Sequence, residues 1–112
     1  MKLYAIQASL LLTLILGTLA KAESAKDIYE DRCAKCHGTD GDGNGRGGRS
    51  LKTKSTAFND KVVMAKATDE ILFKSIKEGG PAVGQSKEME AFSTLTDPEV
   101  KDLITYIRAM AK

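Results

Sequence analysis

The residues best suited to chemistry lie together in one short motif, Cys33-Ala34-Lys35-Cys36-His37. This motif contains both cysteines and the only histidine of the 112-residue chain. Two thiols about one helical turn apart can add to the two vinyl groups on one edge of a haem, and the next residue turns its imidazole under the iron. The spacing therefore predicts one covalently bound haem c, with Cys33 and Cys36 as thioether attachments and His37 as an axial iron ligand.

Two other uses of this motif fit the sequence less well. A structural zinc site needs four Cys or His ligands, and the chain offers three consecutive candidates with no second pair. A thioredoxin-like C-x-x-C motif belongs to a βαβ setting, whereas Cys33 follows an amphipathic helical stretch and His37 precedes a glycine-rich loop. Both patterns leave haem attachment as the favoured interpretation.

A sixth iron ligand would come from one of four methionines. Met1 belongs to the N-terminal segment, and Met110 is in register with the apolar stripe of the last predicted helix, which favours a core position. Met89 follows the turn-forming residues 79–84, where an irregular backbone can bring a thioether toward the face opposite His37. Met64, in an apolar stretch of undetermined structure, remains the alternative.

The N-terminal residues 1–22 have the pattern of a secretory signal peptide. Lys2 precedes an apolar run, and Ala20-Lys21-Ala22 supplies small residues at the −3 and −1 positions of a cleavage site. The alternative is an uncleaved anchor, since the run approaches the roughly 20 residues that cross a bilayer. We expect cleavage after Ala22, a mature domain over residues 23–112, a periplasmic location and no stable membrane insertion.

The charge of the mature chain is balanced. Without Lys2 and Lys21, the 17 basic residues fall to 15, which equals the number of acidic residues. This balance gives no support for nucleic-acid binding, and we expect the partners to be redox proteins, donor and acceptor unspecified. Lys74, Lys77 and Lys87 could form a positive rim for an acidic partner, although a solvated helix face explains them equally well.

Three helices are predicted, over Ser24 to about Arg32, Thr68 to Glu78 and about Pro98 to Ala111. Ser24 and Thr68 are the expected N-caps of the first two. For the last helix we favour Asp97 as the cap over a capping box of Thr96 and Glu99, because proline restricts the residue before it. Residues 38–50 and 79–95 read as loops, and Val62-Val63-Met64 is too short to assign.

At 90 residues with few aromatic side chains, the mature domain is expected to need its haem to fold. It resembles the small mono-haem cytochromes c of bacterial periplasms. The matching stretches are Asp27-Ile28-Tyr29, Cys33-Ala34-Lys35-Cys36-His37-Gly38, Asp40-Gly41-Asp42-Gly43, Met89-Glu90-Ala91-Phe92, Leu95-Thr96-Asp97 and Tyr106-Ile107-Arg108.

The resemblance implies an all-α fold, with the N- and C-terminal helices crossing around the haem and with Tyr106 at the crossing. It also implies Met89 as the sixth ligand. Two departures are Ala25, where the family often has glycine, and Glu90, where it usually has proline after the ligand methionine. Glu90 predicts a freer loop and a weaker iron–sulfur bond.

The glycine-rich loop also matches the opening of an EF-hand calcium site through Asp40, Asp42, Asn44 and Gly45. Position 12 of that pattern, which calls for glutamate, falls on Leu51, so the bidentate ligand is missing. A loop lying along the haem is the favoured interpretation.

The predicted function is electron transfer, by one haem that cycles between Fe(II) and Fe(III), rather than enzyme catalysis. One alternative is a haem c subunit of a larger oxidoreductase. A peroxide-binding or gas-binding haem protein is the less favoured alternative, because the chain has no second histidine for a distal position.

Overall fold

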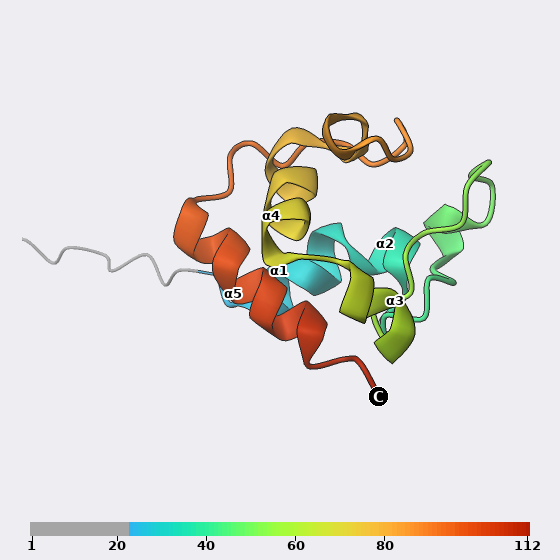
Figure 1. Ribbon diagram of the computed structural model, residues 1–112, viewed down its shortest axis with the longest axis horizontal. Coiled ribbons are helices and arrows are strands. Elements are labelled where there is room, and N and C mark those ends of the chain that lie inside the picture. The colour runs from blue at the N-terminus through green and yellow to red at the C-terminus, as the bar shows by residue number, and fades with distance from the viewer. Residues whose placement is uncertain (1–22) are drawn as a thin grey trace, which may run out of the picture.

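The computed structural model describes residues 23–112, which form helices joined by loops (Figure 1). The predicted signal segment, residues 1–22, lies outside the described residues. Residues 23–112 contain no strand, and the predicted all-α class is confirmed. Within the same range, no helix is long and apolar enough to span a bilayer.

The helical elements follow one another without internal repetition. In chain order they are α1 (Ala25–Arg32), α2 (Ala34–His37), the 3-10 turn η1 (Arg46–Gly48), α3 (Lys61–Lys66), α4 (Asp69–Glu78), the 3-10 turn η2 (Gly80–Val83) and α5 (Asp97–Arg108).

The core forms where α1 and α5 cross, as the resemblance implied (Figure 1). Tyr29 of α1 and Tyr106 of α5 meet there with ring centroids 5.3 Å apart. The apolar stripe of α5 is buried, and α4 packs against the same helix. Burial of these side chains supplies the main stabilisation of a domain of this size.

The caps of α1 and α4 agree with the sequence prediction. The Ser24 side chain accepts the N–H of Asp27, and the Thr68 side chain accepts the N–H of Ile71. Each cap satisfies an N–H group that the first helical turn leaves without a partner.

The predicted cap of α5 was wrong: Thr96, and not Asp97, is the N-cap. The Thr96 hydroxyl accepts the N–H of Glu99 (3.3 Å), and the Glu99 carboxylate accepts the N–H of Thr96 (2.9 Å). This reciprocal pair outweighs the restriction that Pro98 places on Asp97. The hydrogen bond from the Thr96 N–H to the carboxylate lowers the pKa of Glu99.

The unassigned stretch around Met64 is helix α3. Asp60 caps it, because its carboxylate accepts the N–H groups of Val62 and Val63. Arg108 of α5 then holds the end of α3 through the carbonyl oxygens of Met64 (3.3 Å) and Ala67 (2.6 Å). A short helix of this kind is fixed by its cap and by tertiary contacts more than by its own propensity.

Candidate functional site

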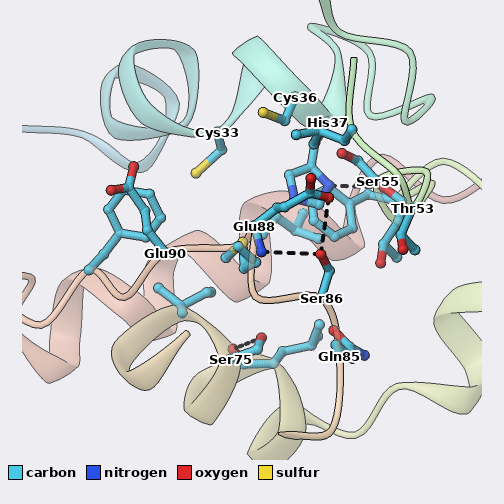
Figure 2. Close-up of a pocket in the computed structure, with 18 of the residues that line it drawn as sticks. Cys33, Cys36, His37, Thr53, Ser55, Ser75, Gln85, Ser86, Glu88 and Glu90 are labelled. Atoms are coloured by element: carbon cyan, nitrogen blue, oxygen red, sulfur yellow. Dashed lines mark hydrogen bonds between the residues drawn. The ribbon is translucent and has the colours of Figure 1, made fainter. Parts of the chain in front are cut away.

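Cys33, Cys36 and His37 lie at the junction of α1 and α2, on one side of a cavity (Figure 2). Cys33 ends α1 and begins α2, and its backbone N–H donates to the Tyr29 carbonyl oxygen (2.9 Å). α2 is a single turn that ends at Gly38, whose φ of 83° favours glycine. We call this side of the cavity, residues 33–37, the cysteine wall.

His37 is oriented by two contacts from a distant segment. Its Nδ1 lies 3.0 Å from the Thr56 carbonyl oxygen, and its ring stacks on Phe58 with centroids 4.3 Å apart. Because a carbonyl oxygen only accepts, Nδ1 carries the proton and Nε2 carries a free lone pair, which is the ligating form of imidazole. Burial lowers the pKa of His37 and keeps the ring neutral.

Tyr29 supports the end of the cysteine wall through Gly38, the residue that follows it. Its hydroxyl donates to the Gly38 carbonyl oxygen (2.7 Å), and its side chain is fully buried. Burial raises the pKa of Tyr29 far above its usual range, so the hydroxyl remains a donor. Burial likewise raises the pKa of Cys33 to about 11, so this side chain is a thiol at neutral pH.

The cavity has a volume of about 350 Å³, within the range of sites that bury a small molecule or cofactor. Its lining is mainly apolar and comes from α1, α2, α4, α5 and loop segments between them. The large apolar side chains that line it are Leu51, Phe58, Ile71, Leu72, Ile76, Phe92 and Ile107.

The side of the cavity opposite Cys36 and His37 includes Gln85 and Ser86 (Figure 2). We call residues 85–90 the methionine wall, because Met89 of this segment also lines the cavity. Met64 is only 3% exposed, packs in the hydrophobic core and does not line the cavity. The structure thus brings Met89, rather than Met64, into one cavity with Cys33, Cys36 and His37.

Comparison with known proteins assigns the family. The family model for cytochrome c oxidase, cbb3-type, subunit III, matches residues 20–107. The chain belongs to this family. A solved structure, the KustC0563 c-type cytochrome, is 33% identical to it, with a TM-score of 0.63 over 80% of this chain and 100% of that chain. No protein of curated function gives a significant match.

The chain is therefore a small c-type cytochrome with the fold predicted from its sequence. Membership of the family implies covalently bound haem c and electron transfer through it. The cavity fits such a cofactor by its chemistry, since an apolar space has two thiols, a neutral imidazole and a thioether on its walls.

The lysines considered for docking have different environments in this cytochrome. Lys77 donates to the Leu95 carbonyl oxygen (2.6 Å) and forms an ion pair with Asp97 (3.1 Å). Lys74 and Lys87 are exposed. Lys77 therefore joins α4 to the segment before α5, and this role explains it without a partner protein.

The loop with the partial calcium pattern is organised by the backbone. The Asp42 carboxylate accepts the N–H of Asn44 (2.9 Å), which closes a local turn. Among residues 23–112, no group of three or more His, Cys, Asp or Glu side chains is arranged to hold a metal ion.

The sequence did not identify Thr56 or Phe58 as parts of the site. The contacts of Thr56 and Phe58 with His37 span about twenty residues of loop, and no local pattern announces them. The Gly79-Gly80-Pro81 signal indicated the end of a helix and an irregular segment before Met89, but not the contacts that hold this segment.

Proposed function

We propose that this cytochrome is an exported periplasmic electron carrier that holds one haem c and moves one electron at a time. The observation that carries the proposal is the shared cavity, because both cysteines, the only histidine and Met89 line it. No other motif of the described chain competes for this space.

Each residue has a defined role in the proposal. Cys33 and Cys36 would hold the haem through thioether bonds, and His37 would present Nε2 to the iron because Thr56 occupies Nδ1. Met89 would supply the sixth ligand. When bound, the haem supplies an iron that accepts and releases one electron.

The surrounding residues set the conditions for that exchange. The mainly apolar lining would limit the access of water, and a methionine thioether favours reduced iron, so ligation by both His37 and Met89 would raise the reduction potential. If both residues bound the iron, no position would remain for a substrate. This arrangement supports a carrier rather than an enzyme.

Haem staining on a denaturing gel tests the attachment. The mature protein should keep its haem peroxidase stain, while Cys33→Ala combined with Cys36→Ala should lose it. Mass spectrometry of the stained protein should give the mass of one haem on residues 23–112. A mass that includes Met1 would reject signal cleavage, and stain lost from the unmodified protein would reject the thioether bonds.

The proposed partners are redox proteins with an acidic docking surface. Residues 43–59 contain no acidic residue, and their four basic side chains, Arg46, Arg49, Lys52 and Lys54, are all exposed. None of the ion pairs among residues 23–112 involves them. Lys54 also lines the haem cavity, so this basic segment adjoins the site.

Small redox reagents of opposite charge test this surface. Arg49→Glu combined with Lys52→Glu should slow oxidation by anionic ferricyanide at low salt and speed oxidation by a cationic cobalt complex. Lys26→Glu combined with Lys101→Glu, at exposed positions of α1 and α5, is the control with the same change in net charge. Equal effects of the two substitutions would show that net charge, and not this segment, controls access.

A second candidate is a haem c subunit of a larger oxidoreductase. It is favoured by the match to a subunit of cbb3-type cytochrome c oxidase over residues 20–107. Mild solubilisation and size-exclusion chromatography distinguish the two, since a carrier elutes at the size of the single chain and a subunit elutes with its complex.

A further inference from the structure

Gly80 is the first residue of η2, one residue beyond the C-cap of α4, and it is buried against the methionine wall. Its N–H donates to the Met89 carbonyl oxygen (2.9 Å), and its own carbonyl oxygen accepts the N–H of Gln85 (2.9 Å). Two backbone hydrogen bonds from one residue therefore hold the two ends of segment 85–89.

The segment between these ends closes on itself. The N–H of Met89 donates to the Ser86 carbonyl oxygen (3.2 Å), and the Ser86 hydroxyl accepts the N–H of Glu88 (3.1 Å). The same hydroxyl donates to the Glu88 carboxylate (3.3 Å). These internal hydrogen bonds make segment 85–89 a compact turn. Its position at the cavity therefore depends on its hydrogen bonds with Gly80.

Gly80 also sets how closely this turn approaches α4. A Cβ atom at position 80 would collide with the Ser86 carbonyl oxygen and would lie 3.0 Å from the Cβ of Met89. Backbone oxygen cannot yield as the end of a flexible side chain does, so any larger residue at position 80 must displace the turn.

We propose that Gly80 is the positioning residue for the Met89 thioether. The absence of a side chain at position 80 lets segment 85–89 sit close to the end of α4, and the hydrogen bond to the Met89 carbonyl fixes the depth at which its side chain enters the cavity. This inference rests on the proposed ligation of iron by Met89.

Gly84 provides a matched control in the same loop. Its φ of 71° means that alanine there would strain the backbone, but a Cβ at position 84 would meet no atom within 4 Å. Gly84→Ala therefore destabilises the loop without pushing on segment 85–89. A comparison of the two variants separates two effects. Gly80→Ala displaces segment 85–89, whereas Gly84→Ala only strains the backbone of the loop.

The experiment is the far-red charge-transfer band of methionine–iron bonding in the ferric holoprotein, together with carbon monoxide binding to the ferrous form. We expect Gly80→Ala to lose the band and to bind carbon monoxide at least about tenfold more tightly. Gly84→Ala should keep both wild-type properties and show only a lower melting temperature. Met89→Ala, as reference, should lose the band.

Each outcome decides a separate claim. If Gly80→Ala and Gly84→Ala weaken the band equally, Gly80 has no positioning role, while the Met89→Ala result still stands for the ligation. If Met89→Ala keeps the band, the ligation is wrong and the inference fails with it. A band that survives Gly80→Ala also rejects the inference.

Amide hydrogen exchange covers the case in which Gly80→Ala does not fold. In the wild-type holoprotein the Gly80 amide, bonded to Met89, should exchange at least about tenfold more slowly than the Gly84 amide, which is shared between the Gly80 and Pro81 carbonyl oxygens in an exposed turn. Reduction of the iron should slow the Gly80 amide further, because a thioether favours Fe(II). Equal exchange at the two glycines would contradict the proposal that the Gly80 hydrogen bond holds Met89 in place.

Discussion

The two walls of the haem cavity are built in opposite ways. The cysteine wall is five consecutive residues on a helical turn, and Tyr29 and Thr56 brace it through hydrogen bonds at 2.7 and 3.0 Å. The methionine wall is a loop that is fixed near the end of α4 by backbone hydrogen bonds to Gly80. Attachment chemistry needs fixed spacing and is readable in the sequence. Ligation by a single thioether needs only correct placement, which distant residues provide.

Loss of the haem should have the largest effect, because under the proposed ligation the cofactor would join the two walls. We expect the Cys33→Ala and Cys36→Ala double variant to lack a cooperative thermal melt and to show weak helical circular dichroism. The domain is small, and without haem an unfilled apolar cavity of about 350 Å³ would destabilise it. A well-folded apoprotein with a sharp melt would show that α1 and α5 hold the walls without haem.

Met64→Ala tests whether a methionine outside both walls acts differently from Met89. Met64 is 3% exposed in the core, so its truncation should cost about 3 kcal/mol in the free energy of unfolding. Its effect on the far-red spectrum should be absent. Denaturant titration and spectra of one preparation measure both quantities, and a cost below about 1 kcal/mol would contradict the core assignment.

Tyr29→Phe weakens the brace of the cysteine wall. The change leaves the buried Gly38 carbonyl without its donor, and we expect a loss of about 1.5 kcal/mol in unfolding free energy. Tyr106→Phe is the control, since Tyr106 is partly exposed and its hydroxyl makes no hydrogen bond among the described residues. Equal losses for both tyrosines would mean that the hydrogen bond from Tyr29 to Gly38 does not stabilise the wall.

Lys77→Met removes the tie between α4 and the segment that follows the methionine wall. Methionine keeps the apolar stem but loses the contacts with Leu95 and Asp97, so we expect a loss of about 1 kcal/mol. Lys74→Met, at an exposed position of the same helix, should be nearly neutral. If Lys77→Met and Lys74→Met unfold at the same denaturant concentration, Lys77 does not have this role.

The sequence predicts most of what local chemistry decides. Ser24 and Thr68 mark the starts of α1 and α4. The cysteine motif lies on one helical turn at the cavity. Errors arise where two local rules compete or where contacts are distant. Thr96 and Asp97 both satisfy cap rules, and the reciprocal bonds with Glu99 decide between them. The hydrogen bonds of Gly80 cannot be predicted from the sequence, because its partners, Gln85 and Met89, belong to a loop without periodicity.

Glu90 illustrates the same limit. In place of the proline usual in the resembled family, it predicts a freer loop, yet two further features restrain this loop. The Gly80 hydrogen bond holds Met89, and the N–H of Phe92 donates to the Ile76 carbonyl oxygen of α4 (2.8 Å). The segment is therefore fixed on both sides of position 90, by bonds that the identity of that residue does not reveal.

The ferric far-red spectrum of the wild-type holoprotein, recorded beside those of Met89→Ala and Met64→Ala, tests the two-wall arrangement most directly. We expect the methionine–iron band in the wild type and in Met64→Ala, and its loss in Met89→Ala together with a lower reduction potential and carbon monoxide binding by the ferrous form. A band that survives in Met89→Ala and disappears in Met64→Ala would show that the sixth ligand comes from the core, and that the loop held by Gly80 is not a wall of the haem site.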